Sequence, residues 1–192
     1  MRFLVRFSNT KHCSAEVKSL SKTAYESVKQ LGGDIGNLRV SSYAIELDLL
    51  IVSKAKLRPA INLLEEKMGR LLTVRELDVP GSQTSIDDEI LNGIDLFNTE
   101  RYWESHEALE FAWRRATGLE KDILQGVILV AAALVHLQKN ENKVALSVIQ
   151  RANDILSQSP KHSIQIDIEN LREELAKMTS QNNPKFIKLK KS

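Results

Sequence analysis

The spacing of hydrophobic residues changes near residue 80, and no other feature constrains the fold as strongly. Before this point, short stretches of period two alternate with longer stretches at steps of three and four, and beyond it the spacing is helical almost throughout. Strand side chains alternate between two faces, whereas helix side chains return to one face about every 3.6 residues. The sequence therefore predicts an α+β protein with two domains.

The first part, residues 1–80, predicts a βαββαβ domain of the ferredoxin-like, or split βαβ, arrangement. Strands are expected at residues 3–7, 38–40, 45–51 and 72–79, and helices at residues 17–31 and 57–68. Gly32 and Gly33 can end the first helix, and Pro59 fits the first turn of the second. No residue in this domain indicates a ligand, although a small ligand or a homo-oligomer suits it better than RNA, because the aromatic strand of RNA-binding sheets is missing.

The second part is expected to be all helical. Residues 81–85 have the composition of a linker, and Ser85 is placed to cap the first helix of a bundle of about five helices in residues 86–180. Thr99 is the expected cap of the second helix, and Gly118 is its expected end.

The remaining residues, 181–192, are polar and then basic, with four lysines and no acidic residue in the last eight. Such a tail is usually solvated and flexible. The formal net charge of +2 requires no acidic partner, so nucleic-acid binding is not expected. Cys13 is the only cysteine, which favours the cytoplasm, and the longest apolar stretch, Val127–Leu137, is shorter than the roughly 20 residues of a membrane span.

Residues 101–115, RYWESHEALEFAWRR, carry more polar and aromatic chemistry than a core helix needs. On a helix, six of these side chains fall within about a third of the circumference: Trp103, His106, Glu107, Glu110, Trp113 and Arg114. A histidine and a carboxylate four residues apart are placed for a salt bridge, a proton relay or two metal ligands.

The next predicted helix, Leu124–Gln138, is apolar except for its terminal glutamine, Gln125 and His136. Eleven residues separate Gln125 from His136, which is about three turns, so both point to the same side. A buried polar side chain without a partner costs about 1–3 kcal/mol, and an interior polar network is therefore expected.

This region resembles the family known as domain of unknown function 309. The strings FNTERYWESHEALEFAWR and LQGVILVAAALVH carry the resemblance, and the family pattern of His, three residues, Glu, two residues and an aromatic residue falls on His106, Glu110 and Trp113. The resemblance covers about residues 86–156. It implies a helical fold and a shared polar site, together with a metal-binding role that rests on the motif alone.

A divalent metal ion would need at least three protein ligands, and the candidates are His106, Glu110 and His136, with Glu107 as a spare. In a helical hairpin that turns near Gly118, His136 would be displaced by about 9 Å along the axis from His106. The same register would place Gln125 beside Glu110, where a hydrogen bond is easier to form than the metal site.

Three interpretations remain open. The favoured one is a site for a small ligand or a divalent metal, with ligand contacts from Trp103, Glu107, Trp113, Arg114 and Gln125. The second is a structural or protein-interaction module in which the polar cluster only sets helix packing. The third is a metal-assisted hydrolase with Glu107 or Glu110 as general base. The HExxE sequence departs from the HExxH of zinc proteases, so peptidase activity is not expected.

Overall fold

The computed structural model describes residues 1–77, 85–158, 162–163 and 165–191. It divides into two units, one of Met1–Ser82 with Gln138–Asn140 and one of Gln83–Leu137 with Glu141–Ser192. The predicted linker at residues 81–85 lies outside the described residues except for Ser85.

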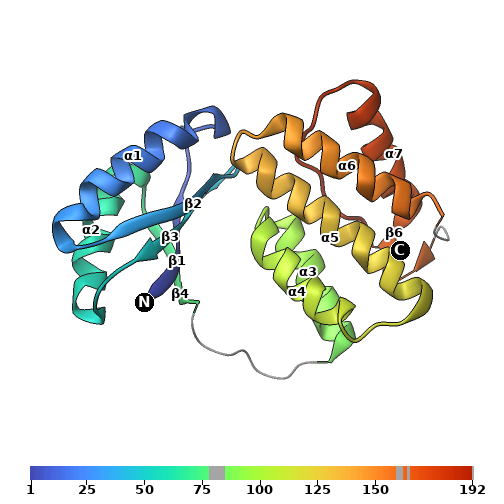
Figure 1. Ribbon diagram of the computed structural model, residues 1–192, viewed down its shortest axis with the longest axis horizontal. Coiled ribbons are helices and arrows are strands. Elements are labelled where there is room, and N and C mark those ends of the chain that lie inside the picture. Colours follow the sequence, from blue (N-terminus) through green and yellow to red (C-terminus); the bar gives the residue numbers. More distant parts are fainter. Residues whose placement is uncertain (78–84, 159–161, 164, 192) are drawn as a thin grey trace. The chain divides into compact units, whose positions relative to one another are not determined.

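The N-terminal unit contains the predicted four strands and two helices. In chain order they are β1 (Arg2–Ser8), α1 (Val17–Val28), β2 (Asp34–Val40), β3 (Ala44–Leu50), α2 (Leu57–Met68) and β4 (Leu71–Glu76). The strands form one antiparallel sheet in the order β2-β3-β1-β4 (Figure 1). This is the βαββαβ arrangement that the alternating periods predict, so the α+β fold class is confirmed.

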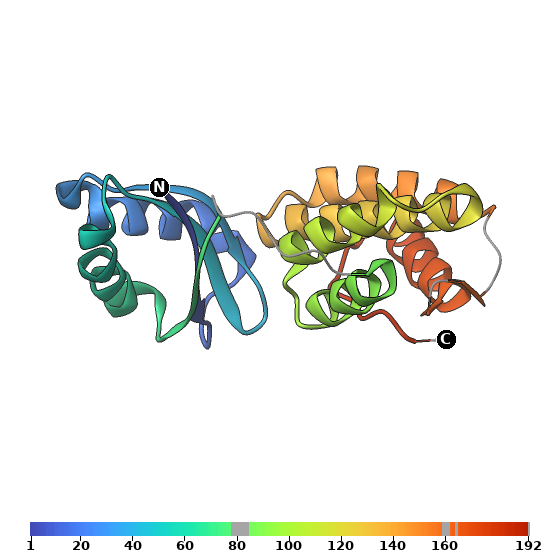
Figure 2. The same ribbon diagram turned by 90° about the horizontal axis from the view of Figure 1, so that it is seen from below.

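One face of this sheet forms the core of the unit. Phe3, Val5 and Phe7 of β1 are buried with Leu47 and Leu49 of β3, and the same cluster includes residues of α1 and α2. Both helices lie on this face of the sheet (Figure 2). Side chains of a strand alternate between faces, so the intervening charged residues lie on the opposite face.

That opposite face carries a network of ion pairs between neighbouring strands. Arg2 Nη2 lies 2.5 Å from Asp48 Oδ2, and Arg6 Nε lies 2.8 Å from Glu46 Oε1. Arg39 of β2 lies 3.4 Å from the other carboxylate oxygen of Glu46. Opposite charges on adjacent strands support the register that the apolar face selects.

The second unit consists of helices and one short two-stranded ribbon. Its elements are α3 (Ile86–Asn98), α4 (Tyr102–Trp113), α5 (Gly118–Gln138), α6 (Asn142–Leu156), β5 (His162–Ser163), β6 (Ile166–Asp167) and α7 (Ile168–Ser180). Ser85 caps α3 as predicted, because its hydroxyl accepts a hydrogen bond from the backbone N–H of Asp88 at 3.1 Å. The five expected helices are therefore present in the described part of the chain.

Two glycines allow these helices to pack closely. A Cβ atom added to Gly93 in α3 would lie 2.6 Å from Cγ of Leu109 in α4. A Cβ atom added to Gly126 in α5 would lie 2.5 Å from Cγ of Leu156 in α6. Both distances are too short for real contacts, so each helix pair approaches at a point where a side chain is missing. Figure 2 shows α5 and α6 side by side.

The predicted limits of the second helix are wrong. Thr99 does not cap α4, because its hydroxyl donates back to the carbonyls of Asp95 and Leu96 and completes the end of α3. Gly118 does not end α4 either. It has a φ of +57° and begins α5, while α4 already stops at Trp113. Glycine takes this left-handed conformation readily, so it marked the break between two helices but not the end of the first.

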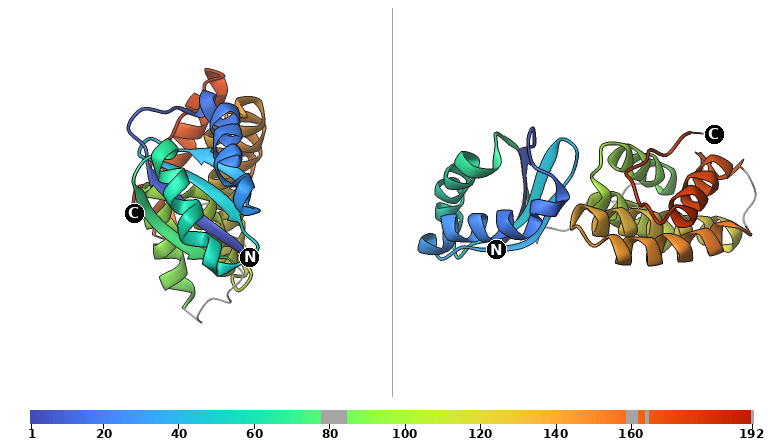
Figure 3. Two further views of the ribbon diagram at one scale, coloured as in Figure 1. Left: turned by 90° about the vertical axis from the view of Figure 1, so that its left-hand side faces the viewer. Right: turned by 90° about the horizontal axis from the view of Figure 1, so that it is seen from above.

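The C-terminal tail also differs from the solvated end that its composition predicts. Residues 185–191, here called the C-terminal strap, lie along the helical unit (Figure 3). Leu189 is only 3% exposed, and the side chain of Asn98 holds its backbone. The apolar residues Phe186, Ile187 and Leu189 between the lysines explain the difference, since burying them against the bundle removes apolar surface from water.

Candidate functional site

The predicted polar stripe lies at the surface of α4 and not in the interior of the bundle. His106 and Glu110 are partly covered, with side chains 26% and 35% exposed, while Glu107 and Arg114 are exposed. Trp103 and Trp113 are half-buried and pack against the edge of the hydrophobic core. The stripe is therefore partly accessible and its two aromatic residues are anchored, although the Nδ1 atom of His106 is itself buried.

His106 occupies the middle of this stripe between an aromatic ring and a carboxylate. Its ring stacks on Trp103 with centroids 5.8 Å apart and planes inclined by 3°. Its Nδ1 lies 3.9 Å from Oε2 of Glu110, one turn further along the helix. The other carboxylate oxygen of Glu110 accepts a hydrogen bond from Arg114 at 2.7 Å. Because 3.9 Å is too long for a hydrogen bond, the imidazole of His106 and the carboxylate of Glu110 face each other without a direct bond between them.

Trp113 ends the stripe next to a cation. The Nζ of Lys121, from the first turn of α5, lies 4.6 Å from the centroid of the Trp113 ring. An ammonium group at this distance from an indole ring is attracted by its π electrons. The contact links the end of α4 to the start of α5 and leaves a positive charge beside the stripe.

His136, the third predicted metal ligand, does not join His106 and Glu110 in a metal site. Gln125 is half-buried in α5, and the Nδ1 of His136 lies 2.5 Å from Oε2 of Glu141, just beyond the end of that helix. Within the described residues, no three histidine, cysteine, aspartate or glutamate side chains are close enough to hold a metal ion together. Of the predicted metal ligands, His106 and Glu110 are the two that lie close to each other, and together they could supply two ligands to a metal ion.

The polar residues that set the helix packing lie elsewhere on α4 and were not predicted. The hydroxyl of Ser105 is fully buried and donates to the carbonyl of Gly93 in α3 at 2.8 Å. Glu104 is 4% exposed and accepts two hydrogen bonds of 2.6 Å from Arg101. The small residues Gly93 and Ser105 are the only sequence signal for this contact, since small residues favour close helix packing.

His12 and Cys13, an adjacent pair in the first unit, serve a local role. The Nδ1 of His12 lies 3.0 Å from Oε1 of Glu16, and the N–H of Cys13 donates to the other oxygen at 2.9 Å. The hydrogen bond from His12 and then that from Cys13 lower the pKa of the Glu16 carboxyl. These contacts cap the short helical turn that precedes α1.

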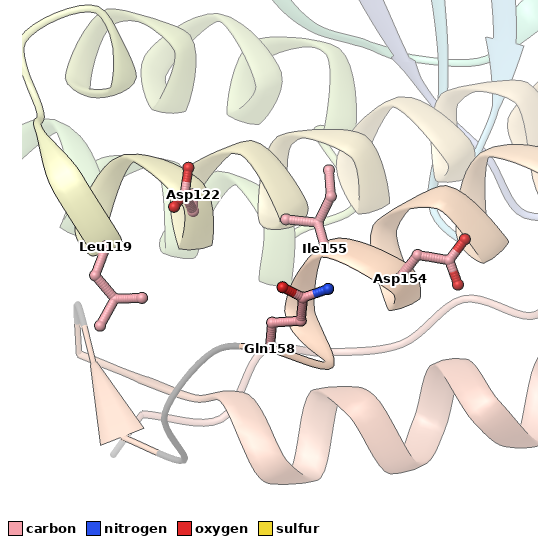
Figure 4. A pocket seen from close by; sticks show the side chains of 5 residues that line it. All are labelled: Leu119, Asp122, Asp154, Ile155 and Gln158. Atoms are coloured by element: carbon pink, nitrogen blue, oxygen red, sulfur yellow. The ribbon is translucent and has the colours of Figure 1, made fainter.

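A hollow of about 470 Å³ lies between the start of α5 and the end of α6. Figure 4 shows its described lining residues, which are Leu119, Asp122, Asp154, Ile155 and Gln158. None of them belongs to the predicted stripe, and the Asp154 carboxylate accepts a hydrogen bond from Gln150. This hollow is therefore separate from the candidate site on α4.

The fold defines an α+β protein whose second unit is helical and carries the stripe on α4. Residues 90–148 match the family model described as Domain of unknown function (DUF309), which confirms the resemblance seen in the sequence. The match runs from α3 into α6 and includes every residue of the stripe. No curated protein matches the chain. None of the helices in the described residues combines the length and the apolar character that crossing a membrane requires.

Proposed function

We propose that the helical unit is a binding module, and that the α4 stripe binds a divalent transition-metal ion through His106 and Glu110. The main support is the spacing of 3.9 Å between His106 Nδ1 and Glu110 Oε2. Two ligands with metal bonds of about 2.0–2.1 Å in a tetrahedral site lie about 3.4 Å apart. A small rotation of either side chain closes this difference.

The two ligand types narrow the choice of ion. Imidazole nitrogen with a carboxylate suits zinc, cobalt or nickel better than magnesium or calcium, which prefer oxygen ligands only. Two protein ligands leave the other coordination positions to water or to a small molecule. The half-exposed ring of Trp103 beside His106 offers a flat apolar surface to such a molecule.

The test is a titration of the full-length protein with Co²⁺ or Zn²⁺, followed by calorimetry and by tryptophan fluorescence. We expect Co²⁺ to quench the fluorescence, because the ring of Trp103 lies 5.8 Å from that of His106. His106→Ala and Glu110→Gln should each weaken binding at least tenfold, and chelator should restore the fluorescence of the parent.

His136→Ala is the matched control, because it removes the histidine of a second histidine–carboxylate pair, His136–Glu141, and leaves the His106–Glu110 pair intact. It should bind the ion as the parent does. Equal affinity of His106→Ala and the parent would show that bound metal sits elsewhere, and no binding by the parent would end the metal proposal.

A cytoplasmic location of the protein remains a prediction that rests on the single cysteine.

A further inference from the structure

The C-terminal strap is held as an extended peptide, with backbone contacts on both sides. On one side, Asn98 Nδ2 donates to the carbonyl of Leu189 at 2.9 Å and Asn98 Oδ1 accepts from the N–H of Leu189 at 2.7 Å. On the other side, the N–H of Asp167 donates to the carbonyl of Lys190 at 2.9 Å, and Ile166 forms a β-bridge with Lys191. Extended peptides that add to the edge of a protein strand are recognised by such backbone bonds.

Two apolar side chains anchor the strap between α3, α4, β6 and α7, and the surface that these elements offer to the strap is here called the groove. Leu189 is buried in the core of the helical unit. The ring of Phe186 stacks on that of Tyr102, with centroids 5.8 Å apart and an angle of 29° between the planes. Tyr102 is fully buried at the start of α4. The groove therefore recognises two apolar side chains three positions apart, in addition to the backbone between them.

Acidic residues lie at both ends of the groove, opposite lysines of the strap. The carboxylate of Glu174 in α7 lies 2.8 Å from Nζ of Lys185, and that of Asp95 in α3 lies 3.6 Å from Nζ of Lys191. The groove thus complements the strap in three ways: by hydrogen bonds to its backbone, by contacts with its apolar side chains and by carboxylates opposite its lysines. None of these contacts depends on the covalent link between the strap and α7.

That link is short. It consists of residues 181–184 after α7, and Asn182 within it has a φ of +50°. The link acts by raising the local concentration of the strap to about millimolar, and it adds no contact of its own. A second copy carries the same strap, and short hinge loops favour the exchange of the segments that they connect.

We propose that the groove formed by α3, α4, β6 and α7 accepts the C-terminal strap of a second copy, so that two copies exchange their straps. The single-chain form dominates at low concentration because of the link. The exchanged dimer grows when protein concentration approaches the effective concentration of the tethered strap.

The test uses two full-length variants in which the strap cannot dock in the groove of its own chain. In one variant the strap is defective, and in the other the groove is defective. The acceptor, Leu189→Ser, keeps Asn98 and the groove but has a strap without its buried anchor. The donor, Asn98→Asp, keeps an intact strap, but its carboxylate faces the carbonyl of Leu189 where the amide donated. We expect each variant alone to be monomeric in analytical ultracentrifugation. An equimolar mixture should contain at least ten times more dimer than either variant at the same concentration.

A mixture with no more dimer than its separate components overturns the proposal, provided that both variants keep the circular dichroism of the parent. If Leu189→Ser does not fold, the pair Leu189→Ala and Asn98→Ala is judged by the same criterion. A labelled synthetic peptide of residues 184–192 is then added to the acceptor. If the acceptor binds the peptide tightly but the mixture contains no heterodimer, exchange between copies is also overturned. The groove would then recognise the strap sequence as a free peptide but not as part of a second chain.

Discussion

Ser105 and Gly93 join α3 to α4 through a single buried hydrogen bond, in which the Ser105 hydroxyl donates to the Gly93 carbonyl at 2.8 Å. The carbonyl belongs to a helix and already serves as a backbone acceptor, so the hydroxyl binds it from the side. This contact fixes where the two helices cross. Ser105 is fully buried at this contact, whereas His106 and Glu110 of the stripe are partly exposed.

Ser105→Ala should lower the free energy of unfolding of the helical unit by about 1–2 kcal/mol, since a buried hydroxyl and its hydrogen bond are lost. Both tryptophans of the chain lie in α4, so tryptophan fluorescence during urea unfolding reports on this unit. Ser147→Ala on the exposed side of α6 is the control for helix propensity and should change the stability by less than about 0.5 kcal/mol. Equal stability of the two variants would argue that the Ser105 bond contributes nothing.

Gly93→Ala should destabilise the same unit by about 1–3 kcal/mol, because the new Cβ atom would lie 2.6 Å from Cγ and Cδ2 of Leu109. In an exposed helix, glycine to alanine would instead stabilise by about 1 kcal/mol. The clash is tested by a double-mutant cycle with Leu109→Ala, which removes the atoms that the new methyl group meets. If Gly93→Ala is as unfavourable in the Leu109→Ala background as in the parent, a different cause is needed.

Much of the first unit could be predicted because β1 and β3 each have one apolar face and carry their charged residues on the other. Phe3, Val5 and Phe7 alternate with period two and share the apolar face of the sheet. A slip of one residue in the strand register would turn all three toward the charged face. In α4, by contrast, buried Ala108, Leu109 and Ala112 lie beside half-buried aromatic residues on both sides. A helix with apolar residues around most of its circumference does not reveal which side faces solvent.

The contacts that the sequence did not predict join segments on either side of a turn or far apart in the chain. Hydrophobic periodicity carries no information about where such segments meet. His136 was expected to face another helix, but the chain turns after α5 and brings back Glu141, five residues away. The strap was expected to be solvated because its lysines outweigh its three apolar residues in composition. Its position depends on the amide of Asn98, which is 91 residues earlier in the chain.

Asn9 should be essential to the loop between β1 and α1. Its side-chain Nδ2 donates to the carbonyls of His12 and Ser41, both at 2.8 Å, and its Oδ1 accepts from the N–H groups of Lys11 and His12. Asn9→Ala should lower the stability of the first unit by about 2–3 kcal/mol, since several partly buried hydrogen bonds are lost together. Hydrogen exchange of the amides of Lys11 and His12 should become markedly faster.

Asn9→Asp separates the two halves of this network, because a carboxylate can still accept from Lys11 and His12 but cannot donate to Ser41. We therefore expect the amide of His12 to stay more protected in Asn9→Asp than in Asn9→Ala. Protection as high as that of the parent in both variants would contradict the assigned role of Asn9.

Docking of the strap should weaken in acid through Glu174. The hydrogen bond from Lys185, followed by that from Lys177, holds the pKa of this carboxyl below its ordinary value of 4.5. A carboxyl whose pKa is lower in the folded state stabilises that state above its ordinary pKa, and the stabilisation is lost as the pH falls through the folded value. The protection factor of the Leu189 amide in hydrogen exchange, which corrects for the intrinsic pH dependence of the exchange, should therefore fall below pH 4.5.

Lys185→Met should raise the Glu174 pKa and reduce this loss of protection, whereas Lys188→Met, which removes a strap lysine that is not bonded to Glu174, should leave both unchanged. A carboxyl titration of Glu174 by NMR that is identical in the parent and in Lys185→Met would show that the ion pair does not hold the strap.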